Sequence, residues 1–426
     1  MVYLPYYILD GKDPAMKAIR ILILSAALTL LLAACGKHSP ATETTASSHT
    51  DVTTAEVVAT TTEVTTTEAT TTVTEETAPP EVIPMPSHDI AQMPRHINGG
   101  AWDTSHVQGM AIDTQRQYMY FSFTQMLVKT DMKGNIIGTV TGLTGHLGDL
   151  DFNDIDGRVY GSLEYKSQNA FYIAIFDVDK ITRMDMSAEK DGIMTAVYLP
   201  DVVEDFTAVV GTSKTQYRYG CSGIDGVAFG PTFGKDASEP FSLMVAYGIF
   251  SDTARVDNDY QVILEFDWRA MEAYEKPLKQ STPHREGPTA KERYFAYTGN
   301  TNYGVQNLEY DMSTGNWLMA VYTGKKSTFP NLPLYIVDGS IAPVMGDILG
   351  QPTPEQGLLL TLAKGAITHK ASGISGWTFG YGDTGLIALD DGYFYVSHDS
   401  KKDGKQTCDA YLYRWTGKGT GFEQVK

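Results

Sequence analysis

Short apolar runs separated by turn residues cover most of the chain after residue 85, and they recur in a fixed order. One of them, residues 106–113 with the sequence HVQGMAID, joins polar residues to a strand-like apolar run. Related stretches begin at His146, Gly223, Gly304 and Gly382. Each has a small or polar pair in third and fourth place and an apolar fifth residue, so the pattern predicts one structural unit that occurs five times.

Three further sets of runs follow these starts. Aromatic and β-branched residues dominate them, and Asp-Gly turns precede two of them, as is typical of short antiparallel strands. The second set comprises 117–123, 157–163, 241–247, 316–322 and 392–398; the third comprises 126–131, 171–177, 260–267, 333–338 and 410–415; the weaker fourth comprises 137–141, 195–199, 294–298, 357–362 and 421–425.

Four strands in each repeated unit predict an all-β protein, namely a β-propeller of about five four-stranded blades. The starts are unevenly spaced, so a ring of six or seven blades with eroded repeats is the alternative. We favour insertions, because residues 201–220, 271–290 and 365–377 are rich in Gly, Pro, Lys and Ser and carry no alternation. The run 268–276 is a candidate short helix.

The N-terminal segment has the features of a bacterial secretion signal. A positive start at Met16 precedes an apolar run, residues 21–34, which is too short for a spanning helix. Leu32-Ala33-Ala34-Cys35 resembles the lipobox of bacterial lipoproteins, which implies cleavage before Cys35 and a lipid on that cysteine. We therefore expect a signal over residues 1–35, with Met16 as the true start, and a lipid-anchored protein at the cell surface. An ordinary cleaved signal with an accidental cysteine is the alternative.

Residues 36–84 consist mainly of Thr, Glu, Ala and Val. With few large apolar residues and repelling carboxylates, such a segment cannot form a core, and we expect a disordered, extended tether. The propeller domain is then expected over residues 85–426.

Two of the repeated phrases, residues 108–113 (QGMAID) and 224–229 (IDGVAF), resemble the inner strands of NHL and SMP-30-type propellers. The resemblance covers short motifs only. It implies the propeller fold and leaves the activity open, since propellers carry many functions.

Charge and cysteine content narrow the partners. The formal net charge is -18, which repels nucleic acid and anionic lipid surfaces. Besides Cys35 the chain has Cys221 and Cys408, too few for a disulfide scaffold, and the sequence leaves open whether these two pair. We expect a monomer that binds a glycan or another surface protein and meets the membrane only through its lipid.

The inner strands of a propeller converge on its axis, so the polar residues at their starts should gather in an axial funnel. Such a concavity lined with polar groups is typical of a binding site. The competing interpretation is that these residues bond loop backbone and ordered water. The residues expected there are His106, Gln108, His146, Asp149, Asp225, Gln306, Asn307 and Asp383, with Glu309 deeper.

Two enzymatic hypotheses use these groups. A glycoside hydrolase would need two carboxylates about 5 to 10 Å apart, and Asp149, Asp225 and Glu309 are the candidates, with His106 or His146 orienting the substrate. A polysaccharide lyase would need a neutral base, for which the equivalent His106 and His146 are candidates. In that case the assisting residues would be Tyr165, Tyr217 and Arg218.

The third hypothesis, which we rank first, is binding without chemistry. Aromatic residues that flank the motif starts, namely Trp102, Trp377, Tyr303 and Tyr381, are candidates for stacking on sugar rings. No cofactor is required, although a hard cation such as Ca²⁺ would find oxygen ligands in Asp149, Asp225 and the amides of Gln108 or Asn307.

Overall fold

The computed structural model describes residues 89–389 and 391–426. The expected signal, the lipidation site Cys35 and the expected tether lie outside the described residues. Within the described part of the chain, no helix has both the length and the apolar character that crossing a bilayer requires.

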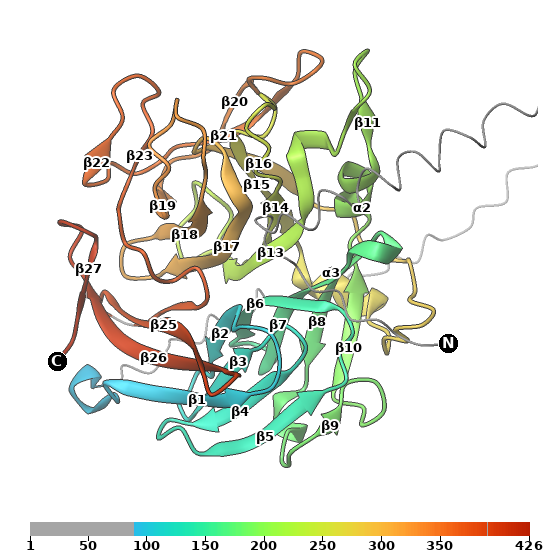
Figure 1. Ribbon diagram of the computed structural model, residues 1–426, viewed down its shortest axis with the longest axis vertical. Helices are drawn as coiled ribbons and strands as arrows, with labels where there is room; N and C mark the ends of the chain where they lie inside the picture. Colours follow the sequence, from blue (N-terminus) through green and yellow to red (C-terminus); the bar gives the residue numbers. More distant parts are fainter. Residues whose placement is uncertain (1–88, 390) are drawn as a thin grey trace, which may run out of the picture. The chain divides into compact units, whose positions relative to one another are not determined.

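Five antiparallel-based sheets follow one another around a ring, in the order of the sequence (Figure 1). The strand that lies innermost in each sheet is one of the five repeated stretches, which confirms the predicted five-bladed β-propeller. These inner strands are β2 (Gly109–Ile112), β6 (His146–Asn153), β13 (Cys221–Gly230), β17 (Thr301–Asp311) and β24 (Leu386–Ala388).

The second and third predicted sets are also strands, each paired antiparallel with its predecessor. The second strands are β3 (Tyr118–Ser122), β7 (Arg158–Tyr165), β14 (Ser242–Ile249), β18 (Asn316–Thr323) and β25 (Tyr393–Lys402). The third strands are β4 (Leu127–Asp131), β8 (Ala170–Phe176), β15 (Tyr260–Phe266), β19 (Leu334–Val337) and β26 (Lys405–Trp415).

The outer strands are less regular. Blades 1 to 3 end in β5 (Ile136–Thr141), β10 (Met194–Tyr198) and β16 (Glu292–Tyr297), and β9 (Met186–Ser187) runs parallel to β5. The predicted fourth strand of blade 4 is wrong: β21 (Gln356–Leu360) pairs in parallel with β16 of blade 3, and β20 (Val344–Asp347) pairs with β21. Leu359 of β21 packs on the apolar cluster between blades 2 and 3. Beyond its ladder with β18, β19 forms isolated bridges from Val337 to Leu362 and from Leu334 to Trp377.

The ring is closed by a strand from the other end of the described chain. In Figure 1 the blue β1 (His96–Trp102) lies along the red β26, with His96 opposite Tyr411 and Trp102 opposite Gln406. The short β27 (Phe422–Gln424) pairs with a later part of β26. Blade 5 is thus built from both ends of the domain, an arrangement that the sequence patterns do not predict.

The core consists of five apolar clusters, each between two neighbouring blades. Tyr120 of blade 1 and Tyr172 of blade 2 belong to one, and Tyr160 of blade 2 and Val245 of blade 3 to the next. The cluster between blades 5 and 1 contains Ile97 of β1. Burial of large aromatic side chains on both faces of every sheet supplies the main stabilisation of such a ring.

The expected insertions carry some structure of their own. Residues 201–220 fall in a helix and a hairpin, and the expected short helix near Trp268 is confirmed. The helices are α2 (Pro200–Thr207) and α3 (Trp268–Met271), the hairpins are β11 (Val209–Val210) with β12 (Thr215–Gln216) and β22 (Ile367–Thr368) with β23 (Ser375–Gly376), and the 3₁₀ turns are η1 (Ile90–Gln92), η2 (Lys166–Gln168), η3 (Val178–Lys180), η4 (Arg218–Gly220) and η5 (Glu272–Tyr274). Cys221 and Cys408 are both buried, and within the described residues they do not form a disulfide.

Candidate functional site

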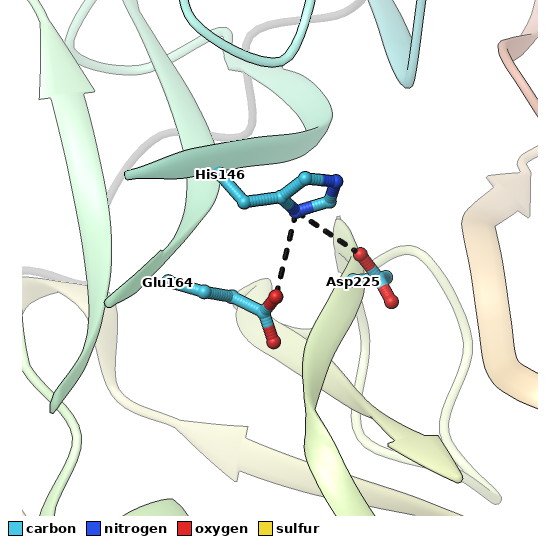
Figure 2. Close-up of side chains that lie close together, drawn as sticks. All are labelled: His146, Glu164 and Asp225. Carbon is cyan, nitrogen blue, oxygen red and sulfur yellow. Dashed lines mark ion pairs between the residues drawn. The ribbon is translucent and has the colours of Figure 1, made fainter. Parts of the chain in front are cut away.

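Polar side chains from different blades meet where the inner strands begin. The most tightly grouped are His146 at the start of β6, Glu164 and Lys166 at the end of β7, and Asp225 on β13; we call these four residues the axial cluster. The Nδ1 atom of His146 lies 3.4 Å from Glu164 Oε2 and 3.7 Å from Asp225 Oδ1. Figure 2 shows both carboxylates turned toward the imidazole. Lys166 Nζ lies 3.0 Å from the same Glu164 oxygen.

Each carboxylate of the axial cluster is held by one of its oxygens. Glu164 Oε1 accepts the backbone N–H of Ile224 at 2.8 Å, and Asp225 Oδ2 accepts the side-chain amide of Gln306 at 3.1 Å. The other two oxygens face His146. Among the described residues, neither Asp225 Oδ1 nor His146 Nδ1 has a hydrogen-bond partner.

Glycines on the neighbouring strands make this close approach sterically feasible. Gly223 has a φ of +125°, and a Cβ at that position would overlap Glu164 Oε1. A Cβ at Gly148 would lie 3.3 Å from Asp225 Oδ1 and would overlap Ser162 Oγ. Gly148, in the third position of its motif, and Gly223, in the first position of the next, therefore serve the packing of blades around the axis.

The pKa values of the two acids in the axial cluster are shifted in opposite directions. Burial, together with the charge of Glu164, raises the pKa of Asp225 to about 7. Burial also acts to raise the pKa of Glu164, but Lys166 and His146 outweigh it and the pKa is lowered. For His146 burial favours the neutral ring, yet Glu164 and Asp225 prevail and its pKa is raised. Adjacent groups with opposite shifts are a feature of functional sites.

A second group from blades 1, 4 and 5 adjoins the axial cluster. The Nε2 atom of His106 lies 2.7 Å from Gln108 Nε2 and 3.4 Å from the Tyr322 hydroxyl. Burial lowers the pKa of His106. Asp383 is partly buried, and burial together with the charge of Asp399 raises its pKa to about 6. The structure thus brings the predicted His106, His146, Asp225, Gln306 and Asp383 to one end of the axis.

Three other predicted residues lie deeper and bind backbone groups of neighbouring blades. Asp149 Oδ2 accepts the N–H groups of Val227 and Leu308, both at 3.0 Å. Asn307 donates to the carbonyl of Gln108 at 2.8 Å and accepts the N–H of Leu386.

Glu309 makes the same kind of contact, since it accepts the N–H of Ala388 at 2.8 Å. Burial raises the pKa of Asp149 and of Glu309 well above the usual range. These contacts join inner strands, and a catalytic role for either acid stays a prediction.

The four aromatic candidates divide by exposure. Tyr303 and Tyr381 are each 47% exposed, and Tyr381 stacks on His398 at 3.8 Å with ring planes 4° apart. Tyr303 adjoins the axial cluster, since its carbonyl accepts the Gln306 amide. Trp377 is 4% exposed, donates to the Gly417 carbonyl and packs on Trp415, so its side chain is part of the core. Trp102 is half-buried and donates to the Gly99 carbonyl.

The sequence reasoning missed Glu164 and Lys166. Glu164 is near the end of β7, a second strand, and Lys166 begins η2 directly after it, whereas the funnel residues were sought at the starts of the inner strands. Their signal was an acid and a base two positions apart at the end of an apolar run. The residues predicted to assist a lyase contact different partners. Tyr165 donates to Gln280, whereas Arg218 pairs with Glu355.

A cavity of about 100 Å³ lies at the opposite end of the axis, where all five inner strands end. Asp113, Asp151, Asp154 and Glu309 line it, beside Arg116 and apolar groups such as Phe229. The axial cluster lies at the other end, where the inner strands begin and where the binding funnel was expected. This cavity is therefore distinct from the axial cluster.

The calcium hypothesis rests on oxygens that have other partners here. Both oxygens of Asp149 accept backbone N–H groups, from Leu150, Val227 and Leu308, and the Asn307 oxygen accepts that of Leu386. Asp225 Oδ1 has no hydrogen-bond partner among the described residues.

The fold defines a class, the five-bladed β-propellers. No family model matches the chain, and no curated protein matches it. Among solved structures it is similar to the Dos1 propeller (14% identity, 76% of this chain and 82% of that one, TM-score 0.30). It is also similar to the PQQ domain of pyranose dehydrogenase from Coprinopsis cinerea (9% identity, 71% of this chain and 81% of that one, TM-score 0.35). A third similar structure is the Cps50 (Swd1) β-propeller domain of Myceliophteria thermophila (9% identity, 71% of this chain and 82% of that one, TM-score 0.28). At these TM-scores the likeness carries no functional argument.

Proposed function

We propose that this protein is a glycan-binding propeller whose site lies where the inner strands begin. The observation that carries the proposal is the solvent-exposed Tyr303, whose carbonyl accepts the Gln306 amide beside the axial cluster, with a second exposed tyrosine, Tyr381, two residues before Asp383. Sugars offer flat apolar faces and hydroxyl groups together, so a site that binds them needs aromatic faces next to donors and acceptors. Gln306, His106 and Lys166 supply such donors and acceptors.

The backbone at Tyr303 supports this proposal. Its φ is +68°, in the left-handed region that non-glycine residues rarely adopt. Such a conformation costs on the order of 1 kcal/mol and is found preferentially at functional sites. The ring of this residue is 47% exposed, and its backbone carbonyl accepts the Gln306 amide.

The test is a titration of the full chain with a panel of neutral and uronic oligosaccharides. Tyr303→Ala and Tyr381→Ala should each weaken binding about tenfold, which corresponds to about 1.4 kcal/mol. Val256→Ala, which truncates a side chain that is 65% exposed elsewhere on the surface, is the matched control. Unchanged affinity in both tyrosine variants would refute the proposal.

The same panel separates binding from the two enzymatic alternatives. Glu164 and Asp225 place carboxylate oxygens within 4.8 Å of one another, near the separation of about 5 to 5.5 Å between carboxyl groups in retaining glycosidases. New reducing ends, lost in Glu164→Gln, would therefore indicate a hydrolase. New double-bond absorbance, lost in His106→Ala, would indicate a lyase.

We further propose that the propeller is anchored at the bacterial cell surface by a lipid on Cys35. The support is the sequence Leu32-Ala33-Ala34-Cys35. Cells supplied with labelled fatty acid should label the wild-type chain and the Cys408→Ala variant, whose altered cysteine is buried in the core, but leave Cys35→Ala unlabelled. Label retained by the Cys35→Ala variant would contradict the anchor.

A further inference from the structure

The spacing of atoms in the axial cluster suits a metal ion better than hydrogen bonds. An N–H···O hydrogen bond spans about 2.7 to 3.2 Å, whereas His146 Nδ1 lies 3.4 Å from Glu164 Oε2 and 3.7 Å from Asp225 Oδ1. Two ligands held about 2.0 to 2.1 Å from a tetrahedral ion are about 3.3 Å apart. All three atoms already lie within 4.8 Å of one another, so small side-chain rotations would bring them to that geometry.

A buried oxygen without a partner points to the same place. Asp225 is 4% exposed, yet its Oδ1 has no hydrogen-bond partner among the described residues. Leaving a buried carboxylate oxygen unsatisfied costs free energy. Figure 2 shows that this oxygen faces His146, and a cation between the two side chains would satisfy both of the unpartnered atoms.

The donors that bind the other oxygen of each carboxylate form an outer shell around the proposed site. Ile224 N–H fixes Glu164 Oε1, and Gln306 fixes Asp225 Oδ2, so each carboxylate is oriented with its other oxygen toward His146. Ligands that are held in this way by second contacts are characteristic of built metal sites. The overlap that a Cβ at Gly223 would make with Glu164 shows how closely the strands enclose this carboxylate.

We propose that His146 Nδ1, Glu164 Oε2 and Asp225 Oδ1 bind a first-row transition dication of the zinc class. One imidazole nitrogen with two carboxylates matches the nitrogen and oxygen ligands of zinc and its neighbours, whereas Ca²⁺ and Mg²⁺ take oxygen ligands in larger number. The His146 side chain is 32% exposed, which leaves a fourth position for water or a ligand atom. The site lies at the proposed glycan-binding end, but it does not rest on glycan binding.

Lys166 competes for the same oxygen. Its Nζ lies 3.0 Å from Glu164 Oε2, and the side chain is 42% exposed, so it can move into solvent when the ion binds. The ammonium charge opposes the ion in either position. Lys166→Met removes this charge and keeps much of the apolar chain, so this variant should bind the cation several-fold more tightly.

The experiment is a titration of the metal-stripped full chain with Zn²⁺, followed by calorimetry, and with Co²⁺, followed by its visible absorption. We expect one strong site and a tetrahedral Co²⁺ spectrum. His146→Ala and Asp225→Asn should weaken binding more than about 100-fold, beyond the 10- to 100-fold typical of outer-shell changes.

His96→Ala is the matched control, because His96 also contacts a carboxylate, Asp409, at 2.6 Å but lies on β1. Wild-type binding in both His146→Ala and Asp225→Asn, or no strong site in the wild type, would overturn the inference. Since His146 is partly exposed, its variant should fold, and circular dichroism checks this. No sugar is present, so the metal site and the glycan proposal can fail separately.

Discussion

At the scale of single residues, two aspartates of the inner strands have opposite surroundings. Asp149 is 2% exposed, and its oxygens accept backbone N–H groups from three inner strands. Asp225 is almost equally buried, at 4%, yet one of its oxygens has no hydrogen-bond partner in the part of the chain that the structure describes. We therefore infer that Asp149 holds the ring together, and that Asp225 serves binding.

Replacing Asp149 tests the first part of that distinction. In Asp149→Ala the N–H groups of Val227 and Leu308 lose their acceptor in the core, and we expect a loss of about 3 to 5 kcal/mol in the free energy of unfolding. Urea denaturation measures it. Glu204→Ala, on the exposed side of α2, should change the same quantity by less than about 0.5 kcal/mol. An Asp149→Ala variant as stable as Glu204→Ala would show that the hydrogen bonds accepted by Asp149 do not contribute to the free energy of unfolding.

Asp383 should make stability depend on pH. Its pKa of about 6 in the folded state lies above the ordinary value of 3.8, because of burial and the charge of Asp399. The folded chain therefore binds this proton more tightly, so the stabilisation is complete below about pH 4 and is lost as the pH rises through 6. The loss should be on the order of 2 kcal/mol, since part of the side chain reaches solvent.

The measurement compares unfolding free energies of the wild type and Asp383→Asn between pH 4 and 7. The advantage of the wild type should shrink as the pH rises. Asp399→Asn, which removes the neighbouring charge, should narrow the pH range of the effect. A difference between wild type and Asp383→Asn that stays constant over this range would contradict the raised pKa.

The sequence predicted the axial residues well where they occupy a fixed place in the repeated motif. His106, His146 and Asp225 were found in this way, and the structure brings them to one end of the axis. The motif could not tell which acids would meet backbone N–H groups, because the donors come from other blades. Glu164 was missed because its approach to His146 depends on the pairing of β6 with β7.

At the scale of elements, the periodic strands were predicted and the irregular ones were not. All five inner strands and the ten that follow them are short, mainly apolar runs that pair with sequence neighbours. The segment that forms β1 contains two glycines and alternates poorly, and its partner β26 lies at the far end of the domain. Outer strands such as β21 are placed by contacts with other blades, which local patterning does not report.

At the scale of the whole molecule, the ring distributes its stability over five equivalent apolar clusters. Each cluster needs both neighbouring blades, so no blade can bury its faces alone. Breaking the ring at one junction therefore exposes apolar surface on two blades. The polar contacts at the axis depend on the same closure, since Asn307 and Asp149 bind groups from other blades.

The pairing of β1 with β26 also affects how the protein can fold during its synthesis on the ribosome. His96 and its partner Asp409 are 313 residues apart, so the first strand to emerge must wait for one of the last. At about 5 to 20 residues per second, that delay is roughly 15 to 60 s. Throughout it β1 carries an unsatisfied edge that could pair with another nascent chain, and the ring can close only once β26 has been made.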